Sequence, residues 1–511
     1  MSALRVHKSI VNAKVNLLFF TLSLFFAFFS RKIFLDCLGD DFIGLTGTLG
    51  NILGYLNLAE LGIGSCISFF LYKPLQCGDQ RKIEEILSVL GYLYRRIGLI
   101  ILAAALIISL FFPIIFKHTP LGLPIIYFSF FSFLGSSLIG YFINYRQILL
   151  TADQKNYLVA IYFQSAGLIK TALQIFIAYH YRNLYVWIAI EFLFGIIGCI
   201  ILNWKINKEY PWLQTNIRNG KTLLKQYPEI ITNTKQIFIH KIKDFLLTKS
   251  DELFVFIFVS LKMVAYYGNY MIVITKISFL FRSVLDSVNA GIGNLVAEGN
   301  KANMMKVFWE LMTIRHFIAG LLCFSIYHLL EPFIILWLGS EYVLDHTILI
   351  LLVIYIYIEN SRGVVDIYNH SYGLFADTWA AWVELIINIC ITFCLGHFYG
   401  IVGILLGKII SVFIIIIFWK PYYLFSAGLK LPIKIYWNGA IRYYVIFGIS
   451  FIFASWIIKW LPFIPQQSYF NWVLFAVCIV SIYILCNFTL LYLFAKGAKD
   501  CILRWRKIIK L

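Results

Sequence analysis

The chain has 511 residues, of which 61% are hydrophobic and only 13% are charged. Soluble globular proteins carry about 25% charged residues, so this composition excludes that class and indicates an integral membrane protein. A net charge of +18 could suggest nucleic-acid binding. The basic residues, however, lie mainly between apolar runs at one predicted membrane face, so no nucleic-acid partner is expected.

Long apolar runs recur from end to end, and each can cross a hydrocarbon core about 30 Å thick as a helix. Helices are the expected form because backbone amides in lipid must be paired within their own segment. We therefore predict an all-α membrane protein with about fourteen transmembrane helices. In chain order they are expected at residues 12–35, 42–72, 83–113, 122–150, 156–179, 184–205, 237–261, 266–297, 305–336, 343–373, 376–398, 400–426, 437–460 and 470–496.

The first apolar run is interpreted as a retained helix rather than a signal peptide. Arg31 and Lys32 follow it where a cleavage site would need small residues. With the N-terminus in the cytoplasm, most lysines and arginines fall in the inward-facing connections, as the positive-inside rule requires. The sequence thus predicts a multi-pass protein with both termini in the cytoplasm and with basic residues that contact anionic lipid headgroups.

One long polar stretch divides the chain. Many transporters are built from two repeated halves around a midplane site, so we predict two six-helix lobes. The first lobe is expected at residues 1–206, a cytoplasmic loop at 207–236 and the second lobe at 237–427. Residues 428–511 would add two further helices and a basic cytoplasmic tail.

No sequence motif indicates catalysis. Gly403–Lys408 resembles a shortened phosphate loop, but it has three residues between its glycines instead of four, and Ile409 follows the lysine. The pairs Gly50/Gly54 and Gly403/Gly407 predict close helix packing. The cysteines and histidines show no metal-ligand spacing. We expect no enzyme activity, no metal and no cofactor.

Ionisable side chains inside the predicted helices are the main functional candidates, because each costs at least about 2.5 kcal/mol near the bilayer centre. Glu359, Arg362, Asp366 and His370 recur at a spacing that puts them on one helix face. Other candidates lie in five more helices. They are Glu60, Lys170, Lys249, Asp251, Glu252, Lys276, Arg282, Asp286 and Glu384.

Two interpretations of these charges stay open. Internal ion pairs, such as Arg282 with Asp286 or Arg362 with Asp366, would hold helices together and bind nothing. Cations at similar depth would instead line a hydrated cavity for a pyrophosphate. The predicted substrate-binding cations are Lys249, Arg282, Lys170, Arg362 and Lys276. Ion coupling, by H⁺ or Na⁺, or pairing is predicted for Glu60, Asp251, Glu252, Asp286 and Asp366.

Three stretches resemble signatures of bacterial polysaccharide flippases of the Wzx type. That family shares a superfamily with multidrug and toxin extrusion (MATE) transporters and the peptidoglycan lipid flippase. The stretches are LGDDFIGLTGTLGNILGYLNLAELGIGSCISFFLYKPL at 38–75, HKIKDFLLTKSDELFVFIFVSLKMVAYYGNYMIV at 240–273 with GIGNLVAEG at 291–299, and VELIINICITFCLGHFYGIVGILLGKIIS at 383–411. Together they cover much of the first twelve predicted helices.

The resemblance implies a V-shaped, MATE-like arrangement of the lobes and alternating access to a cationic cavity. It also implies the cargo, an undecaprenyl-pyrophosphate-linked oligosaccharide for O-antigen, lipopolysaccharide or capsule assembly in the bacterial inner membrane, and further glycan-assembly proteins as partners. Lys249 and Arg282 match the cationic residues of relatives. Several relatives also use arginines in the first two helices; this chain is expected to have no such arginine, which makes Lys170 a candidate substitute.

Two other functions compete with this one. A drug or cation antiporter of the same fold would favour an acidic cavity, whereas the central charges here are of both signs with a cationic excess. A glycan polymerase or glycosyltransferase generally needs a sizeable outward loop for its catalytic groups, and the predicted outward loops are short.

Overall fold

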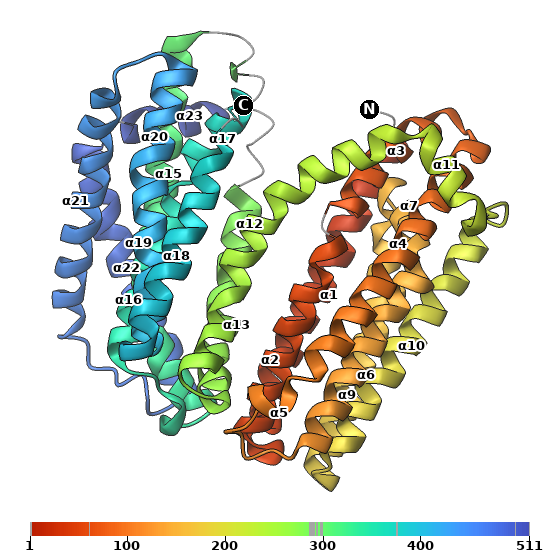
Figure 1. Cartoon of the computed structure of the whole chain (residues 1–511). Helices are drawn as coiled ribbons and strands as arrows, with labels where there is room; N and C mark the ends of the chain where they lie inside the picture. Colours follow the sequence, from red (N-terminus) through yellow and green to blue (C-terminus); the bar gives the residue numbers. More distant parts are fainter. Residues whose placement is uncertain are drawn as a thin grey trace. The chain divides into compact units, whose positions relative to one another are not determined.

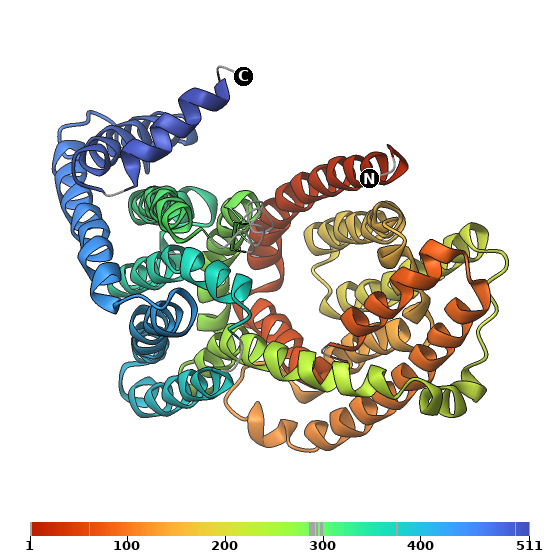
Figure 2. The same cartoon turned by 90° about the horizontal axis from the view of Figure 1, so that it is seen from above.

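The computed structural model describes residues 3–60, 62–285, 292, 295–296, 300–374, 377–495 and 497–509. All regular secondary structure in these ranges is helical, which confirms the predicted all-α class. The chain divides into two compact units, Met1–Ala265 and Tyr266–Leu511. In each unit, long helices lie side by side (Figures 1 and 2).

The first unit is a bundle of long helices with short helical connections. In it α6 packs against α10, α1 against α9, and α12 against α2 and α3. Its helices are α1 (Ala3–Leu38), α2 (Asp40–Leu56), α3 (Ile63–Cys77), α4 (Gln80–Ser109), α5 (Phe112–Ile115), α6 (Leu123–Phe142), α7 (Gln147–Ala152), α8 (Asn156–Val159), α9 (Ser165–Tyr181), α10 (Leu184–Glu209), α11 (Gly220–Gln226) and α12 (Pro228–Phe258). Short segments η1 (Asn57–Glu60), η2 (Asn144–Arg146), η3 (Ala160–Gln164) and η4 (Ile217–Asn219) join some of them.

The second unit contains the remaining long helices. Helix α13 begins within the last residues of the first unit and continues into the second. The helices are α13 (Leu261–Leu285), α15 (Lys301–Trp337), α16 (His346–Ser361), α17 (Gly363–Ser371), α18 (Thr378–Tyr399), α19 (Ile401–Val412), α20 (Lys420–Tyr423), α21 (Ile433–Ile458), α22 (Tyr469–Phe494) and α23 (Ala498–Ile509). Short segments η6 (Ser340–Tyr342), η7 (Phe413–Trp419) and η8 (Leu424–Leu429) complete it.

Within the described ranges, twelve helices are long and apolar enough to cross a membrane. The other two predicted spans are helical but of a different kind. The span expected at 42–72 consists of α2 and α3, which are separated by η1 and by Gly62, whose φ of 95° is left-handed. The span expected at 237–261 belongs to α12, whose several charged residues lower its hydropathy. The count of about fourteen is therefore consistent with the fold.

Two predicted small-residue contacts had different outcomes. A Cβ at Gly403 would collide with the backbone of Leu395, and a Cβ at Gly407 would collide with Thr392. Close packing of α18 against α19 is therefore confirmed at these glycines. At Gly50 a Cβ would meet no atom within 4 Å, so close packing there is a wrong prediction.

Tyr227, in the connection between α11 and α12, joins the polar central stretch to helix α4. Its hydroxyl donates a hydrogen bond of 2.8 Å to Oε2 of Glu85 on α4. Burial and this bond raise the pKa of Tyr227 to about 12, so the phenol stays protonated and able to donate at neutral pH.

Helix α23 is fixed to the membrane-spanning part of the second unit by charge. Nε of Arg504 lies 2.7 Å from Oε2 of Glu310 on α15, and the Glu310 side chain is only 5% exposed. Lys306 and Asp500 form a second, more exposed pair at 3.1 Å. Buried acids need such partners because an uncompensated charge in a low-dielectric interior is costly.

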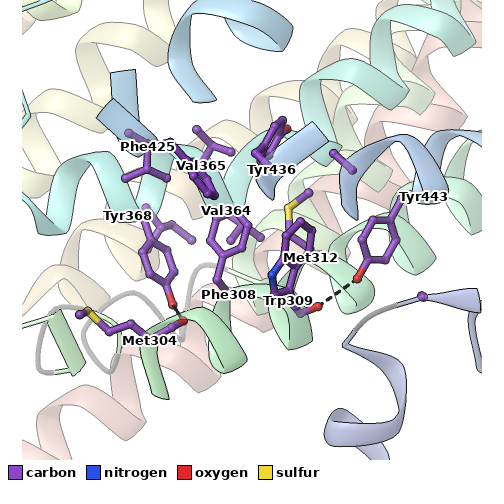
Figure 3. Close-up of a cluster of buried hydrophobic side chains, with 14 of the residues drawn as sticks. Met304, Phe308, Trp309, Met312, Val364, Val365, Tyr368, Phe425, Tyr436 and Tyr443 are labelled. Carbon is purple, nitrogen blue, oxygen red and sulfur yellow. Dashed lines mark hydrogen bonds between the residues drawn. The ribbon is translucent and has the colours of Figure 1, made fainter. Parts of the chain in front are cut away.

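A buried aromatic cluster holds α15, α17 and α21 together. Phe308 and Trp309 on α15 pack with Tyr368 on α17 and Tyr443 on α21 (Figure 3). The Tyr368 hydroxyl donates to the backbone oxygen of Met304 at 2.9 Å. These contacts fix the rotation of α17, and therefore the direction in which its charged residues point.

Candidate functional site

Four charged side chains of the second unit form what we call the arginine cluster: Arg282, Glu359, Arg362 and Asp366. Nε of Arg362 lies 3.0 Å from Oε2 of Glu359 and 3.3 Å from Oδ2 of Asp366. Nη2 of Arg282, on α13, lies 3.7 Å from the same oxygen of Glu359. The predicted pairing of Arg362 with Asp366 on one helix face is therefore present in the structure.

The junction between α16 and α17 positions this cluster. Arg362 is the residue at which α16 ends and α17 begins. Gly363 follows it, and a Cβ there would collide with the guanidinium of Arg315, a buried residue on α15. Val364, Val365 and the adjoining turn pack into the aromatic cluster, so Asp366 is left on the side that carries Arg362.

The two arginines of the cluster differ in how tightly they are held. The Arg362 side chain is 26% exposed and lies between two carboxylates. The Arg282 side chain is 49% exposed, and its distance to Glu359 exceeds that of a hydrogen bond. Arg282 is thus the more loosely held of the two arginines of this cluster.

Further polar residues of α16, α18 and α19 lie next to the arginine cluster. The Tyr355 hydroxyl donates to Oε1 of Glu359 at 3.4 Å. Nζ of Lys408, on α19, lies 4.4 Å from the centre of the Tyr355 ring. Glu384, a buried acid on α18, interacts electrostatically with Arg362. The site therefore contains charges of both signs and is a network rather than a purely cationic chamber.

The remaining second-unit candidates are less well joined to the cluster. Lys276 is partly buried on α13, six residues before Arg282, a spacing that puts the two on different faces of the helix. Asp286 lies outside the described residues. Its predicted pairing with Arg282 therefore stays a prediction.

In the first unit, Lys170 on α9 forms a close ion pair. Its Nζ lies 2.5 Å from Oε1 of Glu191 on α10, and Nε2 of Gln174 donates to the other carboxylate oxygen at 3.0 Å. The charge of Lys170 is therefore already matched within the first unit. For Lys170 the structure therefore shows an internal ion pair, which is the first of the two interpretations that the sequence left open for buried charges.

The acidic candidates of the first unit are joined to neutral donors. The Tyr94 hydroxyl donates to Oε1 of Glu60 at 2.6 Å, and Nδ2 of Asn51 donates to Oε2 of Glu252 at 2.6 Å. Asp251 is 3% exposed on α12. Lys249 lies on the same helix, but its side chain falls outside the described part of the structure.

Sequence reasoning missed several charged residues. Arg31 lies within α1, so the expectation of no arginine in the first two helices is wrong; its Nη2 donates to the backbone oxygen of Ala265 at 2.9 Å. Arg315 on α15 and Lys408 on α19 are further buried cations. Glu191 was overlooked as the partner of Lys170 because it lies on the following helix. A search for every charge inside the predicted spans could have found all four.

No protein-family model and no curated protein matches the sequence. Solved structures do match it in fold. The lipid II flippase MurJ, in an inward closed conformation, is similar with a TM-score of 0.66 and 15% identity over 95% of this chain and 99% of that chain. The chain has the fold of these transporters. An inward-facing MATE family multidrug transporter of the MOP superfamily aligns with a TM-score of 0.58 and 12% identity, covering 81% of this chain and 95% of that one.

These likenesses establish the architecture. The chain is a multi-pass membrane protein with a MurJ- and MATE-like fold, as the resemblance implied. Both solved structures are of proteins named for movement of molecules across membranes.

Proposed function

We propose that this protein is a flippase that moves an undecaprenyl-pyrophosphate-linked oligosaccharide from the cytoplasmic to the outer leaflet for O-antigen or capsule assembly. The observation that carries the proposal is the likeness in fold to a lipid II flippase over 95% of the chain. The sequence signatures of Wzx-type flippases support the choice of cargo. The bacterial inner membrane, cytoplasmic termini and partner glycan-assembly proteins belong to the same proposal.

The arginine cluster supplies a chemical basis for holding the cargo. Arg282 offers a half-exposed guanidinium, and two negative phosphates would compete well for it against a single carboxylate at 3.7 Å. Arg362 lies against both Glu359 and Asp366 and offsets part of their negative charge, so these acids repel the diphosphate less than they would alone. Binding then favours whichever conformation holds the cargo more tightly, because a ligand shifts an equilibrium only through differential affinity.

Complementation tests the proposal. In a flippase-null cell, the wild-type gene restores glycan display and Arg282→Ala does not. Arg81→Ala is the matched control, since that side chain is 90% exposed on α4, and it restores display fully. Lys249→Ala is examined in parallel. If each of the single variants Arg282→Ala and Lys249→Ala restored full display, the assignment of these two residues as phosphate contacts would be wrong.

The drug or cation antiporter is the second candidate, and the MATE-like fold favours it. Expression in a drug-sensitive cell separates the two functions. Resistance to cationic drugs, together with no effect of the wild-type gene on glycan display, would replace the flippase proposal with the antiporter.

A further inference from the structure

A polar cavity lies inside the first unit, apart from the arginine cluster. Its volume is about 390 Å³, which falls in the range of about 300–1,000 Å³ typical of small-molecule sites. Helices α6, α7 and α10 and segments η2 and η3 provide its walls. The polar side chains that line it are Ser136, Ser137, Asn144, Gln147 and Glu191.

The cavity is electrically balanced. Glu191 is the charged residue among its lining side chains, and Nζ of Lys170 lies 2.5 Å from its carboxylate. Gln174 donates to the second carboxylate oxygen. A cation would have to displace Lys170, and a phosphate would meet a carboxylate without a cation in the lining. The cavity is therefore suited to a neutral ligand.

The cavity also contains an unused hydrogen-bonding group. Asn144 is 2% exposed, and its Oδ1 has no hydrogen-bond partner among the described residues. Leaving a buried polar atom unsatisfied costs about 1–3 kcal/mol, so a rotation of this amide that brings Oδ1 to the cavity surface would be favoured by a ligand hydroxyl that donates to it. Ser137 Oγ accepts a bond from Nδ2 of Asn57 at 3.3 Å, which leaves its own hydroxyl proton for a ligand oxygen.

Aromatic rings complete the wall. Phe133 and Phe163 both line the cavity beside these polar groups. Hydroxyl, amide and carboxylate groups next to aromatic rings match the two sides of a pyranose, which has hydroxyls at its edge and C–H groups on its face. An apolar drug would leave the amide of Asn144 unpaired, and a water molecule would leave most of the volume unfilled.

We propose that this cavity binds one neutral sugar residue of the lipid-linked saccharide and thereby selects the cargo. The inference rests on the proposed function for the origin of the sugar. Acidic sugars are disfavoured because their carboxylate would lie close to that of Glu191.

Gly140 provides a variant that fills the cavity. It lines the cavity on α6, and a Cβ there would meet no atom within 4 Å. Gly140→Leu therefore occupies the sugar site without a clash at the Cβ. Gly448→Leu on α21 is the matched control, because its Cβ also meets open space and it lies in the second unit.

Saturation-transfer NMR on the purified full chain tests the proposal with free glucose, galactose, N-acetylglucosamine and glucuronate. At least one neutral sugar is expected to give a signal that Gly140→Leu weakens about tenfold, equivalent to about 1.4 kcal/mol. Gly448→Leu keeps the signal, and glucuronate gives little. The proposal is overturned if no neutral sugar gives a Gly140-dependent signal or if glucuronate binds equally well.

Two further measurements keep this test decisive. If Gly140→Leu does not fold, Asn144→Leu replaces it, because it removes the unpaired amide oxygen at similar size; an unchanged sugar signal in that variant overturns the proposal. Binding of a short-chain prenyl diphosphate without sugar is measured separately. Failure there contradicts the diphosphate site of the proposed function, whereas the sugar assay judges the cavity alone.

Discussion

The two units treat buried charge differently. In the first unit, the cation Lys170 lies 2.5 Å from Glu191, and the acids Glu60 and Glu252 accept hydrogen bonds from neutral side chains. In the second unit, two arginines share Glu359, and Arg282 remains half-exposed at 3.7 Å. A charge inside a membrane helix is thus a weak sign of a ligand site by itself. How fully it is paired carries more information.

Loss of Arg362 should give the largest loss of stability. Arg362→Ala leaves two carboxylates, those of Glu359 and Asp366, without the guanidinium that lies between them, so it should cost more than the loss of a single pair of similar exposure, although less than the sum for two fully buried pairs. The midpoint of thermal unfolding in detergent should therefore fall clearly below that of Arg81→Ala. Equal midpoints would show that the cluster adds nothing to stability.

Breaking the ion pair between Lys170 and Glu191 should cause an intermediate loss of stability. Because both side chains are about a quarter exposed, Lys170→Met is expected to cost about 1–3 kcal/mol, less than the loss of a fully buried partner. The double variant Lys170→Met/Glu191→Leu should recover most of the lost thermal stability, since no lone charge remains. A double variant that unfolds as early in temperature as Lys170→Met would show that the unpaired carboxylate of Glu191 is not the cause of the loss.

Tyr94→Phe tests whether the acids of the first unit are structural. It removes the donor 2.6 Å from Glu60, and a hydrogen bond to a charged group contributes about 1.5 kcal/mol. Its midpoint of thermal unfolding should lie slightly below that of Tyr179→Phe, a control at an exposed position on α9. Equal unfolding midpoints for the two variants would show that the hydrogen bond from Tyr94 to Glu60 adds nothing to stability.

Arg282→Ala should have the smallest effect on stability. Half-exposed ion pairs contribute about 0–1 kcal/mol, so its unfolding midpoint should stay close to that of the wild type even though glycan display is lost. Arg282→Lys keeps the charge but loses the paired geometry and should restore display in part. A large drop in the unfolding midpoint of Arg282→Ala would reclassify this residue as structural.

Much of the fold could be predicted because hydropathy reports it directly. Long apolar runs such as α10 and α22 leave helix as the one form that satisfies their backbone in lipid. The break at Gly62 could not be predicted, because a left-handed turn inside an apolar run leaves hydropathy unchanged. The charged residues of α12 lower its hydropathy, so its span stands out less clearly from the sequence than the others.

The site was harder to predict. The pairing of Arg362 with Asp366 follows from helical spacing and needs no tertiary structure. Pairs between helices, such as Arg282 with Glu359 and Lys170 with Glu191, depend on the rotation and depth of each helix, which one sequence does not give. The sugar cavity was missed because serine, asparagine and glutamine in apolar runs carry no charge to draw attention.

The contact between Arg504 and Glu310 has a practical consequence for handling the protein. The acid sits inside the second unit, and its counterion comes from the last helix of the chain, 194 residues away. Deletion of the tail before Arg504, or proteolysis during purification, would strand a negative charge in the interior. Affinity tags are therefore better attached beyond the intact final helix than substituted for it.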